Sequence, residues 1–288
     1  MKKLIIGCGY VGRRLAERWS AQGDQVFAAT RKPERAAEFA RLGWRPIVYD
    51  INDPHSIYIP SVDLIFFAVG FDRSSGRSMH QVYVAGLTNV LEKLPLVGRF
   101  IYVSSSSVYG QTAGEEVDED AETTPQESSG QVVLEAERIL RQRYPQAIIL
   151  RFAGIYGPGR LLREQALRAG QPILASADRW LNLIQVDDGV QAILAAEAQG
   201  VPGRIYNVAD DEPVARFAFY ELLAELLEAP LPRFVRPVGE ALPPHEQTHR
   251  RVSNKRMRSE LGVKLAYPSY RDGLVASVGK DSWSARPQ

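Results

Sequence analysis

Cysteine and long apolar runs are both nearly absent from this sequence. Cys8 is the one cysteine in 288 residues, so no internal disulfide can form and a reducing, cytoplasmic compartment is expected. No apolar stretch approaches the ~18 residues that span a bilayer. The apolar run near the start is also shorter than the ~7–15 residues of a signal peptide. We therefore expect a cytoplasmic protein without a membrane partner.

The sequence has almost no excess of charge of either sign, and it has few histidines and cysteines that could bind a metal. The 35 basic and 34 acidic side chains give a net charge of +1, which argues against nucleic acid as a partner. The four histidines and the cysteine show none of the spacings of known metal sites, so no metal is expected. The remaining composition, 45% apolar and 24% charged, is that of an ordinary globular protein.

Strand-like and helix-like segments alternate along the chain. The patterns predict strands at residues 3–6, 25–29, 45–49, 62–69, 100–103 and 147–151, and helices at 33–42, 81–94 and 131–143. This alternation predicts an α/β fold with a doubly wound parallel sheet covered by helices on both faces. Ligands of such sheets bind at the carboxyl ends of the strands. The polar segment 113–130 is expected to form a long loop.

A glycine-rich turn follows the first predicted strand. Gly7 permits a tight turn, Gly9 lets the backbone approach a phosphate, and Gly12 lets a helix pack against the strand. Tyr10 and Val11 begin that helix, whose N-terminal amides are suited to binding a pyrophosphate. The pattern therefore predicts a dinucleotide site, and the alternative is an ordinary glycine-rich turn.

Further motifs follow the glycine turn in a consistent order. They are FIYVSSSSVYG (100–110), RFAGIYGPGR (151–160), LIQVDDGVQAI (183–193) and RIYNVADDEPV (204–214). With GCGYVG at 7–12, these motifs make the chain resemble the short-chain dehydrogenase/reductase superfamily, in its extended branch of epimerases and dehydratases.

The resemblance implies a division of the chain and a class of ligand. A Rossmann domain would span residues 1–158, with 183–212 returning to it, and 159–182 and 213–288 would form a smaller substrate-binding region. The cofactor would be NAD or NADP and the substrate a small molecule, so the chain would be an oxidoreductase or an isomerase. The resemblance also allows a homodimer through the two helices that flank the fourth and fifth strands.

Basic residues end the second predicted strand, where an acidic residue would instead bind the ribose of NAD. Arg31 and Lys32 stand there, and an arginine at this point accommodates the 2′-phosphate of NADP. NADP is therefore the favoured cofactor, with NAD as the alternative if both side chains are merely solvated. Other positions match cofactor-contacting segments of the superfamily: Asp50, Ile51, Ala68, Val69, Gly70 and Ser104. For Asp50 the alternative is a residue that only forms a turn.

The Tyr-x-x-x-Lys pair, which moves the proton in this superfamily, has no counterpart here. Counting along the matching helix places Ser129 at the tyrosine position and Val133 at the lysine position. None of the 12 tyrosines has a lysine four residues later. A serine hydroxyl is a far weaker acid than a phenol, and valine carries no charge to assist it, so neither residue can substitute.

Other residues remain as candidates for contact with the substrate. Ser105 matches the catalytic hydroxyl of the superfamily, and Tyr109 and His80 are further candidates for proton transfer. The alternatives are a serine that caps a turn, a tyrosine that packs, and an incidental histidine. Candidate substrate contacts are Ser106, Gly154 and Tyr156.

Two functions are compatible with this pattern. The first is an atypical epimerase, dehydratase or reductase that keeps an NADP site, takes a nucleotide-sugar-like substrate and moves protons with other groups. The second is a non-catalytic NADP-binding sensor or regulatory protein. The retained motifs favour the enzyme, whereas the missing pair favours the second function.

Overall fold

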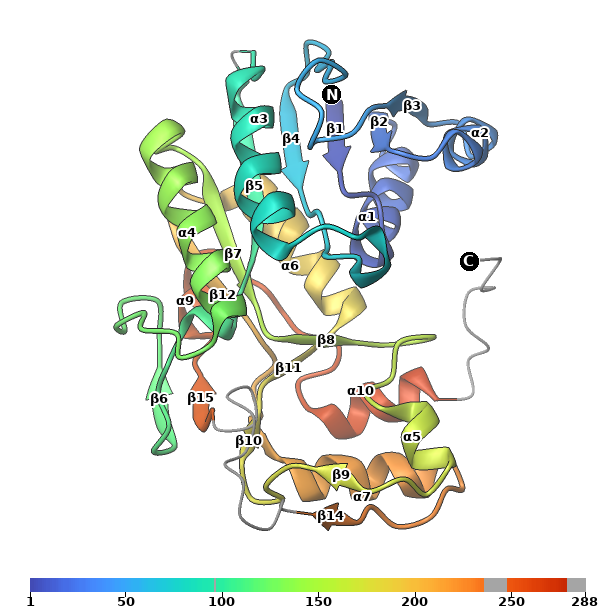
Figure 1. Cartoon of the computed structure of the whole chain (residues 1–288), viewed down its shortest axis with the longest axis vertical. Coiled ribbons are helices and arrows are strands. Elements are labelled where there is room, and N and C mark those ends of the chain that lie inside the picture. The colour runs from blue at the N-terminus through green and yellow to red at the C-terminus, as the bar shows by residue number, and fades with distance from the viewer. Residues whose placement is uncertain (96, 236–247, 279–288) are drawn as a thin grey trace. The chain divides into compact units, whose positions relative to one another are not determined.

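The computed structural model describes residues 1–95, 97–235 and 248–278 (Figure 1). The first half alternates strands and helices as the sequence predicts. Its elements are β1 (Lys2–Ile6), α1 (Tyr10–Ala21), β2 (Gln25–Thr30), α2 (Pro33–Arg41), β3 (Arg45–Val48), β4 (Leu64–Phe67), α3 (Gly86–Glu92), β5 (Arg99–Ser105), β6 (Glu115–Val117), α4 (Ser128–Arg143) and β7 (Ile148–Phe152).

Shorter strands and further helices make up the second half. They are β8 (Gly154–Tyr156), α5 (Glu164–Arg168), β9 (Ile173–Leu174), β10 (Trp180–Leu181), β11 (Leu183–Gln185), α6 (Val186–Gln199), β12 (Ile205–Val208), β13 (Val214–Ala215), α7 (Arg216–Leu226), β14 (Phe234–Val235), β15 (Arg250–Val252), α9 (Lys255–Glu260) and α10 (Tyr270–Ser277).

Most predicted elements are present with ends shifted by one to three residues, and the loop expected at 113–130 contains β6 and the start of α4. Two elements differ more. The strand expected at 62–69 is only Leu64–Phe67, because β4 pairs with β1 over no more than Lys3–Ile6. The helix expected at 81–94 begins as a π-helical turn, Gln81–Ala85, and becomes α-helical at Gly86. Apolar periodicity does not distinguish a π-turn from an α-helix, since both place similar residues on one face.

The central sheet has seven strands in the order β12-β7-β5-β4-β1-β2-β3. The pairs β1–β2, β1–β4, β2–β3 and β4–β5 are parallel. Strands β2 and β3 lie on one side of β1 and the later strands lie on the other. The order of the strands therefore reverses at the boundary between β1 and β4. This is the Rossmann-type arrangement, and ligands bind at such a reversal, beyond the carboxyl ends of the strands.

Alternate strand residues face the two sides of the sheet. Phe66 packs edge-on against Trp19 of α1 at a centroid distance of 6.4 Å, and the Trp19 indole donates a hydrogen bond to Glu197 of α6. Helices α3 and α4 lie side by side over the other face (Figure 1). The core beneath them includes the alternate strand residues Leu4, Ile6, Ile65 and Phe67.

The chain divides into two compact units. The first comprises residues 1–108, 128–151 and 190–206, and the second comprises 109–127, 152–189 and 207–288. Residues 109–127, which the sequence-based division assigns to the first domain, belong to the second unit. The parts of the predicted substrate region at 236–247 and 279–288 lie outside the described residues.

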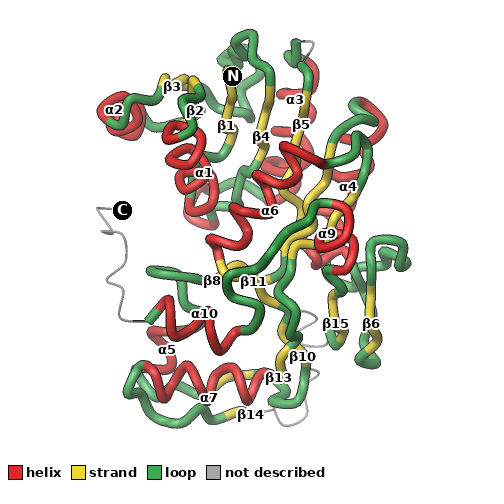
Figure 2. The backbone as a smooth tube through the Cα atoms, turned by 180° about the vertical axis from the view of Figure 1, so that it is seen from behind, coloured by secondary structure: helices red, strands yellow, loops and turns green. Residues whose placement is uncertain are grey.

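The second unit is built from pairs of short strands around its own core. Parallel pairs join β8 to β11 and β6 to β15, while β10 and β13 are antiparallel. Helices α7 and α10 pack together, as Figure 2 shows. Their shared core centres on Tyr156, Phe219 and Leu274. Across the described ranges of both units, no helix combines the length and apolarity required to cross a membrane.

Candidate cofactor site

The glycine turn between β1 and α1 depends on two of its glycines. Gly7 has a φ of +99°, and a Cβ there would lie 2.3 Å from the carbonyl oxygen of Ala68. A Cβ on Gly12 would lie 2.6 Å from the Gly7 carbonyl oxygen and 3.1 Å from the Ile5 side chain. Both positions therefore exclude larger residues, because strand β4 and helix α1 approach the turn so closely.

Gly9 differs from its neighbours because it faces open space. A Cβ on Gly9 would meet nothing within 4 Å, so neither the turn nor its packing requires glycine there. Gly9 is also the N-cap of α1, and no side chain caps that helix or places an acid in its first turn. An open glycine next to uncapped helix amides fits the pyrophosphate of a dinucleotide.

A cavity of about 340 Å³ lies against this turn. Of the residues that the sequence predicts to bind cofactor, eight line it: Gly7, Gly9, Arg31, Lys32, Ile51, Ala68, Val69 and Gly70. Five others are not part of its lining: Tyr10, Val11, Gly12, Asp50 and Ser104. Residues at the carboxyl ends of β1, β2 and β4 all line the cavity, which therefore lies where the strand order of the sheet reverses.

Three basic residues line one part of the cavity. Arg31 and Lys32 follow β2 as predicted, and Arg35, from the first turn of α2, joins them. Arg35 donates a hydrogen bond of 2.7 Å to the carbonyl oxygen of Cys8, which joins α2 to the glycine turn. Sequence analysis missed Arg35, although its place in the first turn of the helix predicted at 33–42, directly after Arg31 and Lys32, was the available signal.

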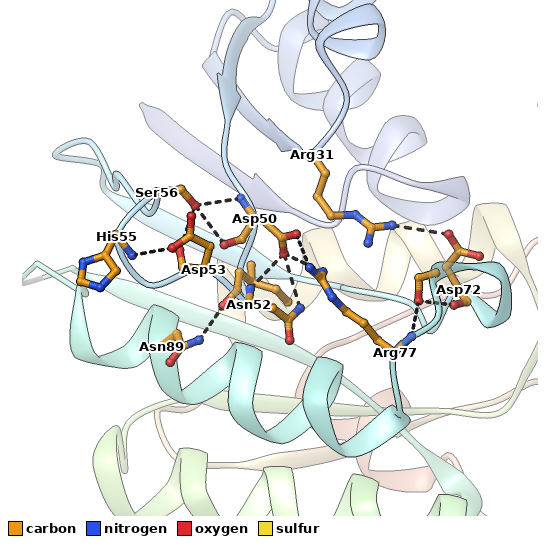
Figure 3. A network of polar contacts seen from close by, with 11 residues as sticks. Arg31, Asp50, Asn52, Asp53, His55, Ser56, Asp72, Arg77 and Asn89 are labelled. Carbon is orange, nitrogen blue, oxygen red and sulfur yellow. Dashed lines mark hydrogen bonds and ion pairs between the residues drawn. The ribbon is translucent and has the colours of Figure 1, made fainter.

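Asp50 is engaged by a residue that sequence analysis also missed. Arg77, in the loop after β4, donates to both Asp50 carboxylate oxygens, and the Asn52 amide donates to the same group (Figure 3). Burial alone would raise the pKa of Asp50, but these hydrogen bonds outweigh it and lower the pKa. The predicted contact of Asp50 with the cofactor is not tested by this arrangement, which gives its carboxylate an internal partner.

A second ion pair joins the same loop to the end of β2. The Arg31 guanidinium lies 3.4 Å from the Asp72 carboxylate, with side chains 40% and 47% exposed (Figure 3). The other Asp72 oxygen accepts hydrogen bonds from the Ser74 backbone and hydroxyl at 3.0 Å and 2.6 Å. These bonds fix the carboxylate beside the cavity, which Asp72 also lines.

The thiol of Cys8 is enclosed within the glycine turn. It is 3% exposed, and burial raises its pKa to about 12 despite the nearby Arg35 and Arg13 guanidinium groups. A thiol with so high a pKa is almost entirely protonated at neutral pH and reacts slowly with oxidants. Cys8 therefore fills the tight turn as a small buried side chain.

Ser104 is turned into the protein and away from solvent. Its hydroxyl donates to Glu137 of α4, which also accepts two hydrogen bonds, of 2.8 Å and 3.0 Å, from Arg151 of β7. All three residues are nearly fully buried. The trio ties β5, α4 and β7 together, one helical turn beyond Val133, itself a buried residue of the same helix.

The remaining candidates in the first unit have local partners. The Ser105 hydroxyl accepts a hydrogen bond of 3.1 Å from the Ser107 backbone amide, and Ser106 begins the 3₁₀ turn that follows. His80 lies 3.3 Å from Glu135, with both side chains about half exposed. The Ser105 contact is a turn cap, which leaves its predicted role in proton transfer untested.

The candidates in the second unit are mostly buried. Tyr109 is 1% exposed, and its hydroxyl donates to the Asn207 side chain at 2.8 Å. Tyr156 is fully buried, with its hydroxyl against Gly273. Burial, and to a smaller extent the nearby Asp210 carboxylate, raises the pKa of Tyr156. Gly154 is exposed at the start of β8. Both tyrosines are therefore packed within this unit, which leaves their predicted roles in proton transfer and substrate contact untested.

Asp210 lies in the same unit and is itself 2% exposed. One carboxylate oxygen accepts a hydrogen bond from the Glu212 amide at 3.3 Å, and the other has no hydrogen-bond partner. Burial, with the neighbouring acids Asp211 and Glu212, raises the pKa of Asp210 well above its usual value.

The parallel sheet, whose strand order reverses between β1 and β4, and the glycine turn after β1 define a Rossmann-type dinucleotide-binding protein. A family model described as the NAD dependent epimerase/dehydratase family matches residues 4–209. The chain belongs to that family.

Individual proteins similar to this chain include one of known activity. A 3-diazoavenalumate denitrifying reductase from a Streptomyces species is 33% identical over 154 residues, which are 49% of this chain. The chain thus matches only half the length of that relative, 50%.

Two solved structures match almost the whole chain. A putative NAD-dependent epimerase/dehydratase from Methylobacillus flagellatus is 31% identical with a TM-score of 0.73, over 96% of this chain and 97% of that one. A functionally unknown conserved protein from Silicibacter pomeroyi is 30% identical with a TM-score of 0.78, over the same shares of the two chains, 96% and 97%.

Proposed function

We propose that this protein is an NADP-preferring enzyme that transfers hydride to or from a small molecule. The observation that carries the proposal is the cavity itself, which the open glycine turn and the basic residues Arg31, Lys32 and Arg35 line together. The name of the Streptomyces relative, a reductase, supports hydride transfer as the reaction class.

Different residues of this chain would bind different parts of the coenzyme. The amides around Gly9 and the N-terminus of α1 would hold the pyrophosphate. The three basic side chains would neutralise the 2′-phosphate, and Arg31 suits this role because its planar guanidinium can form two parallel hydrogen bonds. The coenzyme, once bound, supplies the hydride, so the protein need only orient the substrate and provide a proton path.

Proton transfer in this proposal uses groups other than a Tyr-Lys pair. Ser129 and Val133 occupy the corresponding positions of α4, and Val133 is buried. In the first unit, Ser105 and His80 are the candidates, with bound water as the third. The substrate class we propose, a nucleotide-sugar-like molecule, rests on the family alone.

Coenzyme titration of the full chain tests the proposal. Calorimetry with NADP⁺ and NAD⁺ is expected to show tighter binding of NADP⁺, and Arg31→Asp is expected to reverse the preference. Turnover of NADPH with nucleotide sugars would then be followed by nicotinamide absorbance. Failure of both coenzymes to bind would overturn the proposal. Tight NADP binding without turnover on any substrate would favour the non-catalytic sensor instead.

A further inference from the structure

Asp72 is the one acid among the described residues that line the cofactor cavity. It reaches the cavity from the loop after β4, and it faces the arginine that our proposed function assigns to the 2′-phosphate. The distance between the Arg31 guanidinium and the Asp72 carboxylate is 3.4 Å. The cavity therefore already holds an internal anion opposite the cation that a bound phosphate would require.

The loop that carries Asp72 is anchored at several points. The Asp72 side chain caps a 3₁₀ turn, Arg73–Ser75, through the Ser74 amide. Arg77 binds Asp50 at 2.8 Å and 2.9 Å, and the Phe71 amide donates to the Tyr83 hydroxyl at 3.0 Å. Because these contacts hold the loop on both sides of Asp72, its carboxylate is kept near Arg31 rather than sampling solvent freely.

The two anions cannot both use Arg31 without cost. A 2′-phosphate that binds Arg31 must displace the Asp72 carboxylate or lie close to it, and like charges in contact repel each other. NAD has no phosphate there, and a carboxylate can accept hydrogen bonds from its ribose hydroxyls. The same side chain thus opposes NADP and tolerates NAD.

We infer that Asp72 weakens the preference for NADP by competing with its 2′-phosphate for Arg31. The inference rests on the proposed function, because it assumes that NADP binds in this cavity. Asp72 moderates a preference that Arg31, Lys32 and Arg35 would otherwise make stronger. Its effect falls on the ratio of the two affinities and not on coenzyme binding in general.

Asp72→Asn is the most direct test, because asparagine keeps an oxygen that can cap the Arg73–Ser75 turn. Dissociation constants for NADP⁺ and NAD⁺ would be measured by calorimetry on the full chain. The variant is expected to bind NADP⁺ about two- to fivefold more tightly, the size of effect of an exposed ion pair, and NAD⁺ no more tightly. Asp72→Ser, another capping residue, provides a second variant should the first be unstable.

A double-variant cycle separates competition from general electrostatics. Adding Asp72→Asn to Arg31→Ala is expected to raise the NADP⁺ affinity by less than Asp72→Asn does in the unaltered protein. Asp53→Asn removes an exposed carboxylate that does not line the cavity, and it is expected to leave the affinity ratio unaltered.

The outcomes distinguish this inference from the proposed function. An unchanged affinity ratio in Asp72→Asn, in a protein whose NADP preference still depends on Arg31, would overturn the inference alone. An equal gain in Asp53→Asn would also overturn it, since the effect would then be one of net charge. Absence of coenzyme binding by the unaltered protein would overturn the proposed function.

Discussion

Arg77 and Asp50 are joined by two parallel hydrogen bonds, with Nη1–Oδ1 and Nη2–Oδ2 distances of 2.9 Å and 2.8 Å. This pair ties the loop after β4 to the residues that follow β3, and its side chains are 31% and 26% exposed. A half-buried, two-pronged pair stabilises more than a solvated one, because water screens it less.

Replacing Arg77 with methionine is expected to lower the free energy of unfolding by about 1 kcal/mol. The pKa of Asp50 is depressed in the folded state, so the stabilisation is complete above the unfolded-state pKa of about 3.9 and is lost as the pH falls through the folded value. Urea unfolding at a series of pH values measures both effects. Arg73→Met, an exposed arginine of the same loop, serves as the control, and an equal loss there would contradict the prediction.

Gly7 and Gly9 are expected to respond differently to alanine. At Gly7 the positive φ and the contact with Ala68 should destabilise the fold by about 2–4 kcal/mol. At Gly9 a methyl group meets no protein atom, so Gly9→Ala should unfold near the unaltered protein and bind coenzyme more weakly. Thermal unfolding and calorimetric titration of both variants test this. Normal coenzyme affinity in Gly9→Ala would remove that residue from the site.

The buried pair of Arg151 and Glu137 is expected to be sensitive to the loss of one partner. Arg151→Met removes two of the hydrogen bonds to the Glu137 carboxylate and leaves that charge in the core, which should cost about 3–5 kcal/mol. The exposed pair of Arg143 and Glu92 provides the control, because Arg143→Met should cost less than about 1 kcal/mol. Similar losses in the two variants, measured by urea unfolding, would show that burial does not set the strength of these pairs.

Asp210 is expected to make the fold less stable as the pH rises. Burial raises its folded pKa, so the folded state binds a proton that the unfolded state has lost, and stability falls as the pH rises from the unfolded-state pKa of about 3.9 toward the folded value. Asp210→Asn keeps the acceptor for Glu212 and should flatten this dependence.

Asp118→Asn is the matched control for Asp210→Asn. Asp118 is exposed, and it accepts the same kind of hydrogen bond, from an amide two residues later, at 3.0 Å. Melting temperatures measured from about pH 4 to alkaline pH compare the two variants. A pH dependence that persists in Asp210→Asn would show that another group titrates.

The sheet and the glycine turn were predictable because their signals are local. Apolar runs of strand length, separated by helical periodicity, indicate a parallel sheet, and Gly7 and Gly12 stand where close packing needs them. The bounds of β4 and the π-helical turn were less predictable, because they depend on pairing and packing with residues far along the chain.

The polar partners at the cavity edge were not predictable from local patterns. Arg77 meets Asp50 from 27 positions away, and Asp72 meets Arg31 from 41. Both come from a loop rich in glycine and serine, where no periodicity indicates which way a side chain points. The basic residues after β2 were recognisable because the strand end itself marks the cofactor's ribose.

The enclosure of Cys8 offers a built-in reporter of the glycine turn. No other cysteine competes for an alkylating reagent, and the buried, protonated thiol should label slowly unless the turn opens. The labelling rate of the unaltered chain therefore reads out local opening next to the cavity. Slower labelling in the presence of a coenzyme would show that the coenzyme restricts opening of this turn, and the experiment needs no engineered cysteine.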